Sequence, residues 1–315
     1  MVPHDVISLL VTNIVFTTLA FFTVVARLYT RFGILKHAGI EDYFISVSMA
    51  ASFGHLAGSL FRCIEIRYGL GTPFNTVKHK SLFVKALWAS VPAYYLALLF
   101  VKLSIICQYM RIFKGVTFQR TYKICKILLG VLAVYGCWTV FGSIFQCIPV
   151  QFFWGVGEGS CMNRLAFGFA NAALGIATDI LIFAIPIPSI KSLSMSKTKK
   201  IALGVVFSFG GFACVASIIR LKSLYTISIS HDISLSAIEC VIWSGIEINV
   251  GITCSSISTL KPLVRKTFPR FLSSTNRTQK AEVQVREGSE RGLIRSTADC
   301  DSMNGPNPIR GDKAV

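Results

Sequence analysis

Three charged side chains lie deep inside long apolar segments of the sequence: Lys102, Asp179 and Glu247. A charge at the middle of a bilayer costs about 3 kcal/mol or more when it has no partner, so each is a candidate functional residue. We predict that Lys102 pairs with Asp179, with Glu247 or with both. The amides Asn171 and Asn249 lie in the same segments and are expected to complete the hydrogen bonds.

This predicted polar group has two interpretations. Polar side chains often join membrane helices, so the group could be only a clamp that fixes helix packing. It could also bind a ligand or act as a switch, because two acids facing one lysine leave a surplus negative charge. One acid would then be protonated or would face an incoming cation.

Arg220 directly follows an apolar stretch and is predicted to lie near the outer surface of the membrane. An arginine at that level could meet an anionic ligand. The simpler prediction is that its long side chain reaches the lipid headgroups or pairs with Glu239.

The elements that position these residues are predicted from composition. The chain has 315 residues, of which 53% are hydrophobic and 15% are charged, and its mean hydropathy is +0.60. A soluble domain carries about 25% charged residues, so this chain has to meet lipid. Its apolar runs last about 20 residues, which suits a membrane-spanning helix and is too long for a barrel strand. The predicted fold class is an all-α integral membrane protein.

Seven such segments follow one another, at about residues 6–26, 43–61, 86–109, 127–148, 165–187, 201–219 and 238–260. No Lys or Arg precedes the first segment, which argues against a cleaved signal peptide. With the N-terminus outside, the densest basic clusters lie on the cytoplasmic side, and only the first outer connection departs from this pattern. We therefore predict a seven-transmembrane helix bundle over residues 1–263, with its C-terminus in the cytoplasm.

Residues 264–315 are rich in Ser, Thr, Gly, Arg and Glu and have little to bury, so we predict a disordered, basic cytoplasmic tail. The formal net charge is +17, but the Lys and Arg residues lie mainly in short connections and in this tail. Basic flanks of membrane spans explain that pattern, and no basic patch is interleaved with aromatic residues. We expect the lipid bilayer, and no nucleic acid, as a partner.

Two further groups lie at the predicted ends of the bundle. Arg27, Arg31, Glu41 and Asp42 surround the first cytoplasmic connection. We expect surface ion pairs and anchors there, each worth little, with docking of a partner as a secondary possibility.

Cys147 and Cys161 bracket the second outer connection, which faces an oxidising compartment. A disulfide between them would close a short loop and hold Phe152, Phe153 and Trp154 as a lid over the bundle. The alternative is a pair of unlinked thiols. The ten cysteines show no CxxC pair, so no metal site is predicted.

The order of several motifs resembles the fungal rhodopsin-domain family, also known as the satratoxin-cluster membrane protein family and related to Pth-type fungal receptors. The motifs span about residues 27–263 and read RLYTRF with GIEDY, KLSIICQYMRIF, FQCIPVQFFW with GSC, ATDILIFAIPIPSIK, FSFGGFACVASIIRL, and IWSGIEINVGITC with LKPL. The resemblance implies a receptor-like, seven-helix membrane protein. It also implies a link to secondary metabolism, because several members occur in secondary-metabolite gene clusters.

Other features of the sequence limit the functions that the protein can have. The lysine in the last apolar segment is Lys261 at its inner end, so no retinal Schiff base and no other cofactor is expected. No nucleophile elbow, metal-ligand spacing or phosphate-binding glycine loop occurs, so we do not expect an enzyme.

The sequence favours an orphan receptor that senses a small ligand from outside and signals to a cytoplasmic partner, with the plasma membrane as its expected location. The alternative is a transporter or accessory protein in secondary-metabolite (mycotoxin) biosynthesis. The lack of an internal sequence repeat weakens the transporter interpretation.

Overall fold

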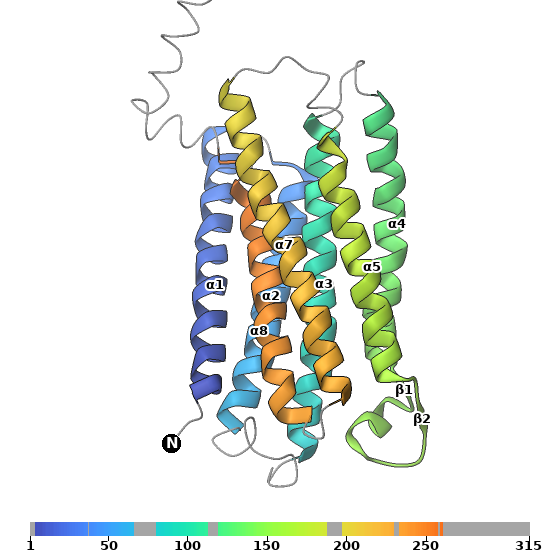
Figure 1. The fold of residues 1–315 in the computed structure, drawn as a ribbon. Helices are drawn as coiled ribbons and strands as arrows, with labels where there is room; N and C mark the ends of the chain where they lie inside the picture. Colours follow the sequence, from blue (N-terminus) through green and yellow to red (C-terminus); the bar gives the residue numbers. More distant parts are fainter. Residues whose placement is uncertain are drawn as a thin grey trace, which may run out of the picture. The chain divides into compact units, whose positions relative to one another are not determined.

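The computed structural model describes residues 4–36, 38–65, 80–112, 119–187, 197–229, 233–257 and 259–260. Within these ranges seven helices are long and apolar enough to cross a membrane. They are α1 (His4–Leu28), α2 (Ile40–Glu65), α3 (Lys80–Ile112), α4 (Gln119–Ile144), α5 (Arg164–Ala184), α7 (Lys197–Ile229) and α8 (Ile233–Ile257). They lie roughly parallel in one bundle, as Figure 1 shows. The predicted seven-helix fold class is confirmed.

The helices are not equally central. α8 packs against α7, α1, α3 and α2, whereas α4 packs mainly on α3 and α5 mainly on α7. In the apolar stretch of α8, 67% of the residues are buried, against 28% in α4. A central helix has few positions that lipid can reach, so polar side chains on α8 have to find partners inside the bundle.

Large apolar side chains cover the outward faces of the peripheral helices. On α1 they include Val15 and Phe22, and on α4 they include Val134 and Trp138, all of which are exposed. Contiguous apolar surface of this kind is rare on soluble monomers and is expected where a helix faces lipid.

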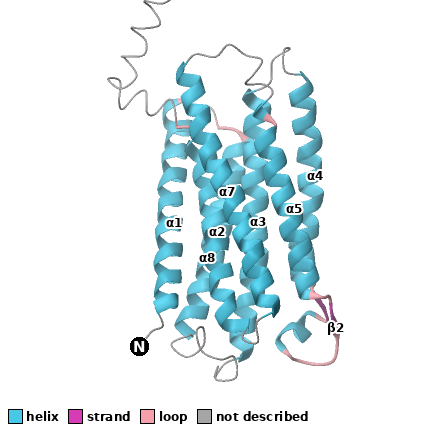
Figure 2. Cartoon of the chain, in the orientation of Figure 1, coloured by secondary structure: helices cyan, strands magenta, loops and turns pink. Residues whose placement is uncertain are grey.

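The two ends of the bundle differ. At the end that holds the N-terminus, strand β1 (Cys147–Ile148) pairs with β2 (Ser160–Cys161) and encloses a short 3₁₀ helix, η5 (Val150–Trp154). Figure 2 shows this loop as a separate feature beyond the helices. At the other end α1 continues into a π-helix, η1 (Tyr29–Ile34). That end is hereafter called the predicted cytoplasmic end.

Several predicted boundaries differ from those of the helices, and two of them affect the placement of the loop and of Arg220. The fourth segment was expected to reach residue 148, but α4 ends at Ile144 and the chain turns into β1. The sixth segment was expected to end at residue 219, but α7 continues to Ile229. Arg220 therefore lies inside the helix, where its charge is paired within the bundle. The predicted tail, residues 264–315, lies outside the described residues.

Candidate functional site

Lys102 on α3 and Asp179 on α5 form an ion pair inside the bundle. The Lys102 Nζ lies 3.0 Å from Asp179 Oδ1. The same ammonium donates to the Gly175 carbonyl at 3.1 Å and to Thr178 Oγ1 at 2.8 Å. Because an ammonium has three protons, these three contacts use its full donor capacity. The structure thus places the predicted partners Lys102 and Asp179 together and joins α3 to α5.

Glu247 on α8 has a different partner from the one expected. Its Oε2 lies 3.0 Å from Arg220 Nε, and both side chains are 4–5% exposed. Tyr94 on α3 donates its hydroxyl to the same carboxylate at 2.6 Å. The Arg220 guanidinium also lies 5.0 Å above the centre of the Tyr94 ring. The predictions that Arg220 reaches the headgroups or pairs with Glu239 were wrong, because a buried carboxylate neutralises it inside the bundle.

Ser217 on α7 connects the two ion pairs. Its Oγ lies 2.6 Å from Glu247 Oε1 and 3.2 Å from Asp179 Oδ2. A hydroxyl has one proton, so it can donate to one carboxylate at a time. The five side chains that form this central charge chain are Lys102, Asp179, Ser217, Glu247 and Arg220.

The central charge chain contains two cations and two acids on four helices. The surplus negative charge expected from two acids facing Lys102 alone therefore does not arise, because Arg220 supplies the second cation. Balanced pairing lowers the cost of holding four charges at this depth. It also means that moving any one of α3, α5, α7 or α8 disturbs an ion pair.

The two predicted amides do not complete the central charge chain. Asn249 on α8 accepts a hydrogen bond from Ser52 at 3.0 Å and donates to Thr17 at 3.0 Å, so it joins α8 to α2 and α1. Asn171 on α5 has a side chain that is 1% exposed and lies beside the Tyr95 phenol. Among the described residues, neither Oδ1 nor Nδ2 of Asn171 completes a hydrogen bond of standard geometry.

A narrow cavity lies next to the central charge chain, between α3, α4, α5 and α7. Its polar wall is formed by Tyr95, Lys102, Tyr135, Thr139, Asn171 and Arg220. The Tyr135 hydroxyl donates to the Asn171 backbone carbonyl at 2.8 Å, so it holds α4 against α5 beside the cavity. Neither carboxylate of the central charge chain lines the cavity.

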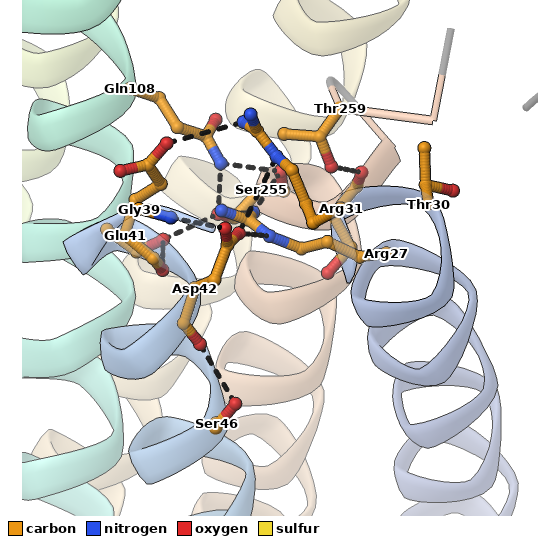
Figure 3. A network of polar contacts seen from close by, with 12 residues as sticks. Arg27, Thr30, Arg31, Gly39, Glu41, Asp42, Ser46, Gln108, Ser255 and Thr259 are labelled. Carbon is orange, nitrogen blue, oxygen red and sulfur yellow. Dashed lines mark hydrogen bonds and ion pairs between the residues drawn. The ribbon is translucent and has the colours of Figure 1, made fainter. Parts of the chain in front are cut away.

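A second buried network lies at the predicted cytoplasmic end (Figure 3). Arg27 on α1 is 0% exposed, and its Nε lies 2.8 Å from Asp42 Oδ1 on α2. Its Nη1 donates to the Ser255 backbone carbonyl on α8 at 2.9 Å. Asp42 also accepts the Gly39 N–H at 3.0 Å, at the start of α2. One arginine thus ties three helices together.

Glu41 occupies the other half of this cytoplasmic network. Its Oε1 lies 2.6 Å from Arg111 Nη1 on α3 and 3.4 Å from Arg31 Nη2. Ser104 on α3 donates to the Glu41 backbone carbonyl at 2.9 Å, and Gln108 donates to the Ser255 carbonyl at 3.1 Å. The network therefore spans α1, α2, α3 and α8.

The prediction that Arg27, Arg31, Glu41 and Asp42 form exposed surface pairs was wrong, since all four are at most 8% exposed. One signal in the sequence could have indicated that these four residues are buried. Arg27 and Arg31 are four residues apart, so on a continuing helix they share one face, and an acidic pair opens the next helix. The serine and glutamine partners on α3 and α8 carry no comparable signal.

The outer loop is closed by a disulfide between Cys147 and Cys161. The loop aromatic Trp154 meets Trp88 on α3 edge-to-face at 6.0 Å between ring centres, and Lys85 Nζ lies 5.4 Å from the Trp154 ring centre. A disulfide at this end agrees with the predicted outside location, because disulfides form in oxidising compartments. The loop therefore rests against the outer end of α3.

The chain is similar to several known fungal proteins. A SAT4 family membrane protein of Emericella nidulans is 27% identical over 283 residues, covering 89% of this chain and 67% of the relative. Fugralins biosynthesis cluster protein 2 of Gibberella zeae is 24% identical over 270 residues, covering 82% of this chain and 65% of the relative. This chain thus spans about two thirds of the length of these curated relatives.

A third relative carries a receptor name. Receptor GIN3 of Arthrobotrys oligospora is 31% identical over 110 residues, which cover 35% of this chain and 26% of that receptor. No solved structure matches the chain. The fungal rhodopsin domain family matches residues 26–266, a region that contains both buried networks. The chain, a multi-pass membrane protein with seven apolar helices among its described residues, belongs to the fungal rhodopsin domain family.

Proposed function

We propose that this chain is a receptor that binds a small molecule inside the helix bundle and signals at its cytoplasmic end. The observation that carries the proposal is the position of the cavity. It touches Lys102 and Arg220, the two cations of the central charge chain. The cavity measures about 20 Å³, room for about one water molecule, so a larger ligand has to move the helices around it apart and thereby acts on the ion pairs that join them. The receptor name of one relative supports the proposal.

The route from the cavity to the predicted cytoplasmic end runs along two helices. α3 contributes Lys102 to the central charge chain and Gln108 to the cytoplasmic network. α8 contributes Glu247 to the central charge chain and Ser255 to the cytoplasmic network. A ligand shifts the protein between two helix arrangements only if it binds one of them better. A small rotation of α3 or α8 would change both networks together.

Several other properties belong to this proposal. The plasma membrane is the expected location, and a cytoplasmic signalling protein is the expected partner at the end where Arg111 lies. No lysine occurs in α8, so this helix provides no Schiff-base site for retinal, and we propose a receptor without a chromophore. The proposed role is binding and signalling, with no reaction catalysed.

Lys102→Met should abolish signalling while the protein still reaches the membrane. The variant leaves Asp179 without its cation and frees α5 from α3, so ligand binding no longer selects one arrangement. A strain lacking the gene would be complemented with wild type or variant and exposed to compounds from outside. Transcript profiling would then be compared at equal membrane abundance. We expect a broad transcript response with wild type and at least partial recovery with Lys102→Arg, which keeps the charge.

The matched control for this experiment is Lys123→Met, which removes an exposed lysine of α4 and should respond like wild type. If Lys102→Met is less abundant but signals normally per molecule, the ion pair is only a packing clamp. That result would contradict a role for Lys102 in signalling.

A second candidate function is transport or an accessory role in making a secondary metabolite. It is favoured by the names of relatives, such as the Wortmanamides biosynthesis cluster protein C of Talaromyces wortmannii, which is 24% identical over 323 residues. The same deletion strain separates the two. Loss or intracellular build-up of one metabolite without a wider transcript response would favour the second candidate. Substrate flux in proteoliposomes would identify a transporter.

A further inference from the structure

We propose that the cavity between α3, α4, α5 and α7 is a binding site for a single water molecule, which joins α4 and α5 to Arg220 of the central charge chain. Such a site would be present whether or not the protein is a receptor. Three features carry the proposal: the size of the cavity, the spare hydrogen-bonding capacity of its polar wall, and the helices that form this wall.

The cavity has the size of one water molecule. Its volume is about 20 Å³. A buried water needs roughly 10–15 Å³ of free space and two to four polar partners, so one water fits and a second does not. Leu98, Leu99 and Leu132 are the apolar side chains of the wall. The water is therefore held from the side on which the polar groups lie.

Two side chains of the wall have donors to spare. The Asn171 side chain is 1% exposed and completes no hydrogen bond of standard geometry with a described residue. It is in contact with the Tyr95 phenol, but one phenol cannot use both the carbonyl and the NH₂ group of an amide. Arg220 pairs with Glu247 through Nε, which carries only one of the five N–H groups of a guanidinium. A buried donor without an acceptor is costly, so a water that accepts from either side chain stabilises the fold.

Two acceptors lie on α4, and both line the cavity. The Tyr135 hydroxyl donates its proton to the Asn171 backbone carbonyl at 2.8 Å, and the Thr139 hydroxyl donates to the Gly136 carbonyl at 3.0 Å. A hydroxyl oxygen also has two lone pairs, so each can accept a hydrogen bond while its proton is in use. A water that accepts from Arg220 or Asn171 can therefore donate to Tyr135 and Thr139.

The bound water gives α4 a link that its direct contacts do not provide. α4 packs mainly on α3, and none of the ion pairs among the described residues includes an α4 side chain. Tyr135 reaches the α5 backbone but not the central charge chain. A water between Tyr135 and Arg220 therefore extends the polar network of the bundle to α4.

One glycine allows a test that keeps the fold. A Cβ at Gly175 on α5 would lie 3.7 Å from the Tyr135 hydroxyl and 4.0 Å from Arg220 Nη2, which are ordinary van der Waals distances. Gly175→Ala therefore puts a methyl group between these two groups, in the place of the water, and alanine is the better helix former. The matched control is Gly168→Ala in the same helix, where an added Cβ meets no atom within 4 Å.

The experiment is radiolytic labelling of the full chain in lipid nanodiscs prepared in isotopically labelled water. An X-ray pulse converts bound water into hydroxyl radicals, which oxidise the side chains that touch it, and mass spectrometry locates the label. We expect Tyr135 to be labelled in wild type and in Gly168→Ala, and its labelling should fall about fivefold or more in Gly175→Ala. Tyr94 is a buried tyrosine that does not line the cavity, so it should carry about fivefold less label than Tyr135.

Three results would overturn the inference. Labelling of Tyr135 no stronger than that of Tyr94 would show that the cavity is dry. Equal labelling of Tyr135 in wild type and Gly175→Ala would show that the water at this tyrosine lies elsewhere. An equal loss of label in Gly168→Ala and Gly175→Ala would reflect a general change in α5. Thermal unfolding in the same nanodiscs checks that both variants are folded.

Discussion

Replacing Glu247 by leucine should lower the free energy of unfolding by about 3–5 kcal/mol, which is the usual cost of leaving a buried charge without its partner. Arg220 would stay buried in the bundle, 3.0 Å from where the carboxylate had been. Tyr94 and Ser217 would lose the acceptor that each now reaches at 2.6 Å. Equilibrium unfolding in detergent micelles or nanodiscs measures this change.

Two further variants make the Glu247 result specific. The double variant Arg220→Met with Glu247→Leu removes both charges, so it should be clearly more stable than Glu247→Leu alone. Glu239→Leu changes an exposed acid of the same helix and should alter stability by less than about 0.5 kcal/mol. Strictly additive effects of the Arg220 and Glu247 substitutions would show that the pair is not coupled.

Arg27→Met should have an effect of similar size at the predicted cytoplasmic end. The guanidinium is fully buried, so its loss leaves the Asp42 carboxylate without its closest cation and removes one of the donors to the Ser255 carbonyl. We expect a loss of about 3–5 kcal/mol in the free energy of unfolding. We also expect looser packing of α1 on α8, since Arg27 joins them directly. Equilibrium unfolding would measure the change in free energy, and limited proteolysis of the N-terminal segment would measure the looser packing of α1.

The Arg27 variant also has a matched control. Arg120→Met removes an exposed arginine of α4 and should be close to wild type in stability. The double variant with Asp42→Asn should recover only part of the loss. Asp42 also accepts the Gly39 N–H at the start of α2, and an amide replaces that interaction less well. If Arg120→Met lost as much stability as Arg27→Met, the loss would reflect a general effect of removing positive charge.

The seven helices could be predicted because lipid demands long apolar runs, and such runs are visible in the sequence. The error at the end of α7 has a clear cause. An arginine that ends a span at the headgroups looks the same in sequence as one buried beside Glu247. Which case holds depends on the neighbouring helix, and a single apolar run carries no information about its neighbours.

The candidate site was predictable in part for the same reason. Lys102, Asp179 and Glu247 were identified because charge is rare in apolar segments, but their pairing depends on how each helix is rotated in the bundle. Arg27 and Asp42 were misjudged because residues near a span end are usually exposed. Ser217 and Ser255 could not be found, since serine is common in membrane helices and becomes significant only once its neighbours are known.

The central claim is that the central charge chain and the cytoplasmic network respond together. It is tested most directly by amide hydrogen exchange on the full chain in nanodiscs, comparing wild type with the double variant Arg220→Met, Glu247→Leu. The amides of interest lie in residues 24–28 of α1 and 42–46 of α2, around the Arg27–Asp42 pair of the cytoplasmic network. We predict faster exchange at these amides, because α8 carries both Glu247 and Ser255. Changes confined to α7 and to α8 around residues 217–250 would show that the two networks are independent and would contradict the proposed signalling route.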